Sequence, residues 1–232
     1  MRTIHWSTIS RAMRPSPMQS EPRLVLASSN PAKLRRLRGL FTGLPLRLST
    51  PGERGLRLNV PEHGLTHEEN AASKAVAWSE AARGYAIASD GGLLLPGLGD
   101  RWNSLHTQRF AGPDATDADR GKTLLNVMSG LSSDARGAWW YEALALAYRG
   151  DLLACWAVCS GQGVIDPSFD PQDMEPGFWV ASLWSFPLIG KTYRQASASD
   201  LAAVGEPWSR LRTIAAPAVR RWLHAARWAP IV

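Results

Sequence analysis

The chain has 232 residues, of which 45% are hydrophobic, and this content is enough to bury a sizeable core in one large domain or two small lobes. A formal net charge of +6 and a pI near 9.8 indicate an anionic partner, such as a nucleotide, a nucleic acid or an acidic membrane surface. The sequence contains no apolar run of about 18 residues that could span a bilayer, and its two cysteines are too few for a disulfide framework, so we expect one compact cytoplasmic unit.

Residues 1–22 are rich in arginine, contain serine and proline, and include a single acid, Glu21. They lack the apolar core of a secretory signal. We expect a disordered lead, with a transit peptide, or a true start at Met13 or Met18, as the alternatives.

The folded part is expected to begin with a buried strand at 23–27, followed by a polar turn and a helix. Asn30 is a good N-cap residue, and Pro31 suits the first helical position because its missing N–H costs nothing there. This arrangement directs free backbone N–H groups and the positive end of a helix dipole at whatever lies over the turn, and Lys33 adds a full charge. It suits a phosphate, although any capped strand–helix unit would look the same.

A second strand is expected at 44–49, then a connection to Gly64 and a helix that begins at Thr66. The spacing from Thr66 to Glu69 is that of a capping box, so Glu69 has two interpretations, a helix cap or a ligand. Lys74 lies about 140° around an ideal helix from Glu69, and the two share a ligand only if the lysine stem bends. A solvated lysine is the alternative.

A buried strand at 85–88 delivers Ser89, Asp90 and two glycines, which predict a tight turn. If the fold brings Glu69 beside Asp90, the two carboxylates form the oxygen-rich site that Mg²⁺ prefers against phosphates. The alternative is a plain turn in which aspartate is the usual turn former.

The second half of the chain predicts further elements. Thr116 and Asp117 cap a helix that runs toward Leu131, and two apolar runs at 138–148 and 152–158 predict a β-hairpin. Cys155 and Cys159 share one face of the second run, and we expect small core residues there rather than a metal or redox site. The chain ends in a basic amphipathic helix at about 211–227, whose Ile214, Val219 and Trp222 are expected to pack against the core.

Four short motifs occur in order along the chain. They are Ser28, Asn30 and Lys33 of (S/T)-x-N-x-x-K; Gly64, Thr66, Glu69, Asn70, Ala71, Lys74 and Ala75 of G-x-T-x-x-E-N-A-x-x-K-A; Ala88 to Leu93 of A-D-D-S-G-L; and Arg109 to Gly112 of S-A-R-F-A-G. Between about residues 23 and 225 the sequence thereby resembles the inosine triphosphate pyrophosphatase family, whose members hydrolyse modified purine nucleoside triphosphates.

The resemblance implies an α/β fold, with a long twisted mixed sheet flanked by helices and two lobes around a central cleft. Residues 23–232 would form this single two-lobed domain, usually as a homodimer. Glu69 and Asp90 would hold Mg²⁺, and Asp90 would orient or deprotonate the attacking water. The implied substrate-binding residues are Ser28, Asn30, Lys33 and Lys74 for the triphosphate, with Gly91, Phe178, Lys191, Trp208 and Arg210 around the nucleotide. The implied products are a nucleoside monophosphate and pyrophosphate.

The sequence also departs from the family pattern. Ser89 stands where the first acid of the D-D pair is expected, and the G-F-G-Y-D-P stretch survives only as Gly177-Phe178. The purine-reading S-H-R aligns with 208–210 and has no histidine. A pocket that hydrogen-bonds a base edge discriminates strongly, so these changes predict altered base specificity. The nearby tryptophans Trp179, Trp184 and Trp208 either stack on a base or fill the core.

Three classes of function follow. The first is a Mg²⁺-dependent nucleoside triphosphate pyrophosphatase with altered base preference. The second is a catalytically silent nucleotide-binding relative, which Ser89 and the lost G-Y-D-P stretch would suit. The third is a nucleic-acid binder, which the pI allows but which no helix-turn-helix, zinc or RNA-binding signature supports.

Overall fold

The computed structural model describes residues 22–228, so the predicted lead lies outside the described residues except for Pro22. Helices and strands alternate along the first part of the chain, as a mixed α/β fold requires. In chain order they are β1 (Arg23–Leu26), α1 (Pro31–Leu40), β2 (Arg47–Ser49), α2 (His67–Ala82), β3 (Tyr85–Leu94), α3 (Asp117–Val127), β4 (Gly137–Tyr148), β5 (Asp151–Cys159), β6 (Gly163–Ile165), β7 (Trp184–Phe186), β8 (Lys191–Thr192), α4 (Ala198–Ala203) and α5 (Pro207–Trp228).

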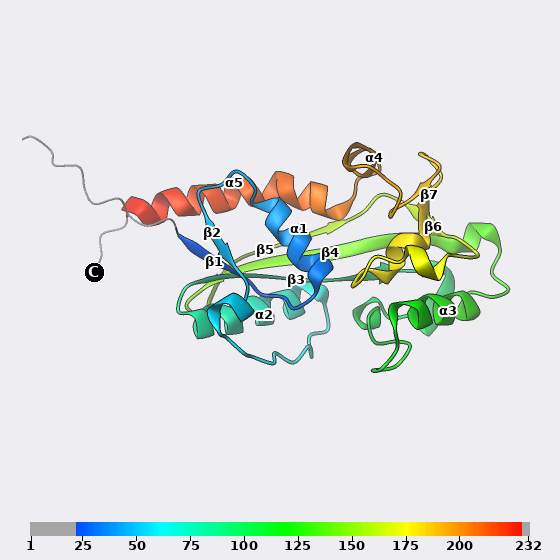
Figure 1. The fold of residues 1–232 in the computed structure, drawn as a ribbon, viewed down its shortest axis with the longest axis horizontal. Coiled ribbons are helices and arrows are strands. Elements are labelled where there is room, and N and C mark those ends of the chain that lie inside the picture. The colour runs from blue at the N-terminus through cyan, green and yellow to red at the C-terminus, as the bar shows by residue number, and fades with distance from the viewer. Residues whose placement is uncertain (1–21, 229–232) are drawn as a thin grey trace, which may run out of the picture.

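One mixed sheet runs the length of the molecule (Figure 1). Its strand order is β2-β1-β3-β4-β6-β7-β8, and β5 pairs with β4 outside this path. β1 is parallel to both of its neighbours, whereas β3 and β4 pair antiparallel over ten residue pairs, from Tyr85 with Tyr148 to Leu94 with Trp139. The predicted fold class, a long mixed sheet flanked by helices, is confirmed.

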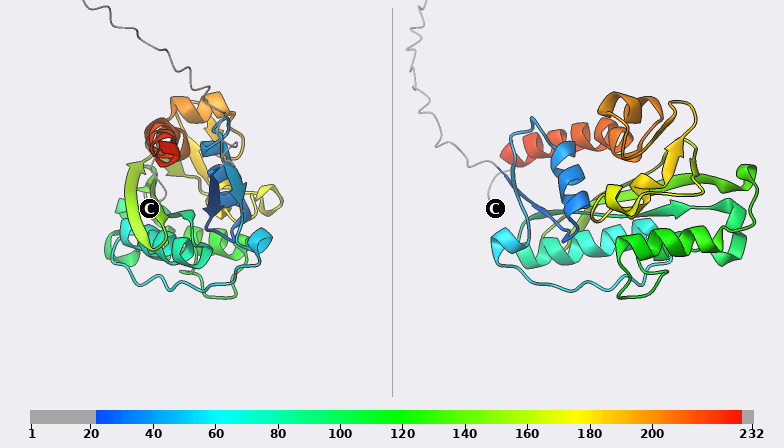
Figure 2. Two further views of the ribbon diagram at one scale, coloured as in Figure 1. Left: turned by 90° about the vertical axis from the view of Figure 1, so that its left-hand side faces the viewer. Right: turned by 45° about the vertical axis from the view of Figure 1, so that its right-hand side comes forward.

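Helices cover both faces of this sheet (Figure 2). α2 packs on one face through small residues, among them Ala71 and Ala75 against Ala88 and Ala143 of the central strands. α1 and α5 lie on the other face, over a cluster that contains Ile87. A third cluster, at the end that carries β6–β8, is separate from these two. We retain the single two-lobed domain as a prediction.

Several local predictions are confirmed in detail. The Asn30 side chain caps α1 and accepts a hydrogen bond from Lys33 N–H. Thr116 caps α3 as predicted, but its capping-box partner is Asp119, and Asp117 is the first residue of the helix. β4 and β5 form the expected hairpin, with Arg149 at φ 50° and Gly150 at φ 93° in its two-residue turn. Positive φ at both positions matches the type I′ turn, whose twist suits paired strands.

The predicted turn at Ser89–Gly92 is wrong, because these residues lie inside the continuous strand β3. The two glycines serve close packing rather than a turn. A Cβ on Gly92 would lie 2.1 Å from the Ser104 carbonyl oxygen, and one on Gly91 would lie 2.6 Å from the Tyr141 carbonyl oxygen. Backbone therefore excludes a side chain at Gly92, and at Gly91 the Tyr141 carbonyl and the Glu142 carboxylate together exclude one.

Two burial predictions also need correction. Cys155 is exposed and Cys159 is half-buried, because within the described residues β5 pairs with β4 alone and so lies at a sheet edge. In α5, Val219 is buried and Trp222 packs near Trp156, as expected, but Ile214 is 43% exposed. Among residues 22–228, no helix is long and apolar enough to cross a membrane.

Candidate active site

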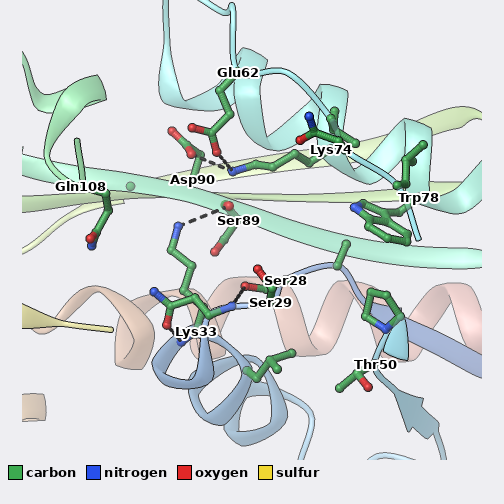
Figure 3. Close-up of a pocket in the computed structure, with 18 of the residues that line it drawn as sticks. Ser28, Ser29, Lys33, Thr50, Glu62, Lys74, Trp78, Ser89, Asp90 and Gln108 are labelled. Atoms are coloured by element: carbon green, nitrogen blue, oxygen red, sulfur yellow. Dashed lines mark hydrogen bonds and ion pairs between the residues drawn. The ribbon is translucent and has the colours of Figure 1, made fainter. Parts of the chain in front are cut away.

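A cavity of about 910 Å³ lies between the β1–α1 turn, α2 and the middle of β3 (Figure 3). The fold brings six of the predicted site residues to its wall, although they come from segments far apart in the sequence. These residues are Ser28, Asn30, Lys33, Lys74, Asp90 and Gly91. The cavity is therefore the candidate active site.

The turn between β1 and α1 forms one wall, and its side chains hold its shape. Ser28 Oγ accepts from Asn30 N–H at 3.1 Å, and Asn30 Nδ2 donates to the Gly177 carbonyl at 2.9 Å. Lys33 extends across the cavity toward β3, where its Nζ lies 3.5 Å from the Ser89 carbonyl oxygen. The N-terminus of α1 and a lysine ammonium thus face the same space, which is an arrangement that attracts anions.

Lys74 and Asp90 form the opposite wall (Figure 3). Lys74 Nζ lies 2.7 Å from Asp90 Oδ1 and 2.9 Å from Glu62 Oε1, so one ammonium bridges two carboxylates. His67 Nδ1 lies 2.6 Å from Asp90 Oδ2, and its Nε2 lies 3.1 Å from Ser104 Oγ. These contacts fix both oxygens of Asp90.

Charge and hydrogen bonding determine the protonation of this group. Burial acts to raise the pKa of Asp90, but the hydrogen bond from His67 and the charges of Lys74 and Lys33 outweigh it and hold that pKa well below the ordinary value. Burial likewise acts to lower the pKa of Lys74, and the neighbouring Asp90 and Glu62 raise it instead. Asp90 is therefore an anion, and Lys74 a cation, at neutral pH.

Glu69 does not lie where we expected it. Its carboxylate accepts from Leu65 N–H at 2.7 Å, it does not line the cavity, and Glu62 is the acid that shares Lys74 with Asp90. The Thr66 side chain caps Glu69 N–H, as predicted, but the return bond of the capping box goes to Leu65. The separation around α2 explains the difference, because Lys74 faces the sheet whereas Glu69 faces the preceding loop.

Sequence reasoning missed Glu62 because it lies in a connection with no regular periodicity. That connection folds back on α2, where Gly64 N–H donates to Asn70 Oδ1 at 2.9 Å. An acid two residues before Gly64, in a loop anchored to the same helix as Lys74, was the available signal. His67 was also missed, since a histidine at the start of a helix has no distinctive pattern.

The donors of this wall suit a hard cation. Glu62 and Asp90 offer carboxylate oxygens, and Mg²⁺ binds through one or two carboxylates and completes its octahedron with water and substrate phosphates. Within residues 22–228, no cluster of three or more His, Cys, Asp or Glu side chains has the geometry of a complete metal site. A cation bound at this wall would take only these carboxylate ligands from the described side chains.

Four of the residues expected around the nucleotide lie outside the cavity. Phe178 is buried in the core beneath the Arg36 guanidinium, 4.3 Å from its ring centroid, and Lys191 forms a surface pair with Asp200 at 2.7 Å. Trp208 packs against the cluster under α1 and α5, and Arg210 donates to the Cys159 carbonyl at 2.6 Å.

None of these four residues lines the cavity, because each is held by packing or pairing outside it. Trp179 and Trp184 are fully buried, which decides for core packing over base stacking. Residues that sequence reasoning did not single out line the cavity instead, among them Thr50, Asn59, Trp78 and Gln108.

Comparison with known proteins identifies relatives of this chain. The model of the Ham1 family matches residues 24–178. A dITP/XTP pyrophosphatase of Xanthomonas axonopodis pv. citri is 40% identical over 171 residues, which cover 73% of this chain and 83% of that protein. One of Syntrophobacter fumaroxidans is 32% identical over 205 residues, covering 87% and 85%.

Solved structures share the fold. A HAM1 protein from Coxiella burnetii superposes with a TM-score of 0.67 at 22% identity, over 90% of this chain and all of that one (100%). The Staphylococcus aureus Ham1 protein gives 0.66 at 22% identity, over 88% and 99%.

Proposed function

We propose that this chain, which belongs to the Ham1 family, is a hydrolase that converts a purine nucleoside triphosphate to its monophosphate and pyrophosphate with Mg²⁺. The observation that carries the proposal is the Lys74 bridge between Glu62 and Asp90, directly across the cavity from the Ser28–Lys33 turn. Two carboxylates face an anion-binding turn and a lysine. This is the division of charge that a metal-bound triphosphate requires.

Each residue has a role in this proposal. Glu62 and Asp90 would hold the Mg²⁺, which when bound would neutralise phosphate charge. The triphosphate is contacted by the polar residues Ser28 and Asn30 and by the backbone at Gly91. It is also attracted by the charges of Lys33 and Lys74. Because its pKa is lowered, Asp90 is a weak proton acceptor, so we assign it to orienting the attacking water, with His67 and Lys74 fixing its carboxylate.

The proposal includes a base preference that differs from inosine and xanthosine triphosphates. Its support is the position outside the cavity of four residues expected around the nucleotide, namely Phe178, Lys191, Trp208 and Arg210. The cavity instead offers the indole of Trp78 and the polar groups of Thr50, Asn59 and Gln108. The proposal also retains the homodimer implied by the resemblance, which light scattering of the purified protein would test.

The decisive experiment is a screen for pyrophosphate release over standard and deaminated nucleoside triphosphates, with and without Mg²⁺. We expect pyrophosphate, not orthophosphate, from at least one substrate and only with the metal. Asp90→Asn is the active-site control and Asp200→Asn, on the surface, the matched one. Nucleotide binding without turnover across the panel would refute the proposal in favour of a silent nucleotide-binding relative.

A further inference from the structure

The two faces of β3 serve different parts of the cavity. Side chains alternate along a strand, so Asp90 points to the α2 face, where Lys74 and His67 contact it. By the same alternation the Ser89 side chain points to the opposite face, where Lys33 reaches the strand, and a side chain at position 91 would do the same. Figure 3 shows this division, with Lys33 and Lys74 reaching the strand from opposite sides. In the pattern that the chain resembles, A-D-D-S-G-L, an acid would stand at position 89 and face Lys33.

A carboxylate does face Lys33, but it comes from the neighbouring strand. Glu142 of β4 is the direct partner of Gly91 in the sheet, so its side chain lies on the same face as Ser89. It is only 1% exposed. Its Oε2 accepts from Trp140 Nε1 at 2.7 Å, whereas its Oε1 has no hydrogen-bond partner among the described residues and lies 4.0 Å from Lys33 Nζ.

Such a carboxylate is costly, since burying a charge with incomplete pairing destabilises a protein unless a partner compensates. The Trp140 indole N–H satisfies one oxygen of this carboxylate, whereas the other oxygen has no hydrogen-bond partner among the described residues. The unsatisfied oxygen is aimed at the lysine of the Ser28–Lys33 turn. The Ser89 hydroxyl, also buried without a hydrogen-bond partner in the described chain, does not replace the absent charge.

The space for Glu142 depends on a second departure from the same pattern. Position 91, serine in A-D-D-S-G-L, is glycine here, and a Cβ at Gly91 would lie 2.2 Å from Glu142 Oε2. A side chain at 91 and the present position of the Glu142 carboxylate therefore exclude one another. The two departures from the pattern fit together. The acid is absent at position 89, and the glycine at position 91 leaves room for the acid at position 142.

We propose that Glu142 supplies from β4 the carboxylate that is missing at Ser89, and that it is a positioning residue which holds Lys33 at the phosphate end of the cavity. This inference rests on the proposed function, because it assigns Lys33 to the triphosphate. A carboxylate thereby still faces Lys33, but it comes from β4 instead of β3.

The test exchanges the acid between the two strands. Glu142→Gln, Ser89→Asp and the double variant are compared with Glu206→Gln, which alters another buried glutamate, bonded to Tyr193 and Ser209 outside the cavity. Three quantities are measured, namely Tm, the Kd for inorganic triphosphate with Mg²⁺ by calorimetry, and kcat/KM for the best nucleotide.

We expect Glu142→Gln to weaken triphosphate binding and kcat/KM by about tenfold, the size of effect seen when a supporting partner of a site residue is lost. Ser89→Asp alone should lower Tm, because it places two carboxylates on one face of the sheet. The double variant should recover binding to within about twofold of the wild type. Glu206→Gln should change Tm only.

Two results would overturn the inference. One is a Glu142→Gln variant that changes Tm but leaves the triphosphate Kd unchanged, as expected of Glu206→Gln. The other is a double variant whose losses simply add. If the wild type binds triphosphate but releases no pyrophosphate, the proposed function fails, and the binding measurements still decide the role of Glu142.

Discussion

The substitutions Glu62→Gln and Glu69→Gln distinguish a metal ligand from a helix-capping residue. The Glu62 carboxylate contacts Lys74 and Arg109, each at 2.9 Å, and shares Lys74 with Asp90, whereas the Glu69 carboxylate accepts a single bond from Leu65 N–H. Glu62→Gln keeps the size of the side chain and removes one of the two carboxylate charges proposed to hold Mg²⁺. Glu69→Gln keeps an oxygen that can still accept from Leu65.

The expected loss for Glu62→Gln follows from its exposure. Losing a strong, preorganised electrostatic group costs about 10²–10³ in turnover. The Glu62 side chain is 32% exposed, so water screens part of its field and the lower limit, about a hundredfold, applies. Glu69→Gln should change turnover by less than about twofold, because it alters one solvent-exposed hydrogen bond outside the cavity.

The assay is steady-state pyrophosphate release over a Mg²⁺ titration, with thermal unfolding as the control for folding. Glu62→Gln should need more Mg²⁺ for half-maximal rate and unfold near the wild-type temperature. A fully active Glu62→Gln together with an inactive, folded Glu69→Gln would refute the reasoning and return the metal site to Glu69.

Three further predictions concern stability and specificity. Because the pKa of Asp90 is lowered in the folded state, its charge stabilises the fold above about pH 4, and this contribution is lost progressively as the pH falls further. The Tm difference between wild type and Asp90→Asn should therefore shrink in acid. Calorimetry from pH 7 to pH 3 would measure it. Gly92→Ala should cost about 1–3 kcal/mol in urea unfolding because its Cβ meets the Ser104 carbonyl, whereas Gly39→Ala, whose Cβ meets nothing within 4 Å, should be neutral or stabilising; equal effects would contradict the packing argument. In competition kinetics, a preference of about a hundredfold or more for inosine triphosphate over every other nucleotide would contradict the altered base specificity.

Local chemistry was predictable from the sequence where a few adjacent residues determine the outcome. The Asn30 cap, the Thr116 capping box and the hairpin at Arg149-Gly150 each depend on residues within one turn of the chain. The order of the motifs also indicated which loops meet at the cavity, and Lys33, Lys74 and Asp90 do line it.

Long-range register was not predictable in the same way. Local sequence predicts a turn at Asp90-Gly91-Gly92, but pairing with β4 along the whole of β3 overrides that preference, and the glycines fit the carbonyls of Tyr141 and Ser104. Glu62 and Glu142 reach the site only because a loop folds onto α2 and β4 pairs with β3 in one register. Neither placement is encoded within a short window.

The β4–β5 hairpin also has a consequence for the order of folding. Its two strands are joined by Arg149-Gly150 alone, so it needs little loop closure, and isolated hairpins form in about 1–10 μs. β3 is synthesised before β4 but pairs with β4 over its full length. During synthesis this pairing therefore cannot form until β4 has left the ribosome. We therefore expect Asp90 to reach its final surroundings late in folding, once the hairpin offers β4 as a template.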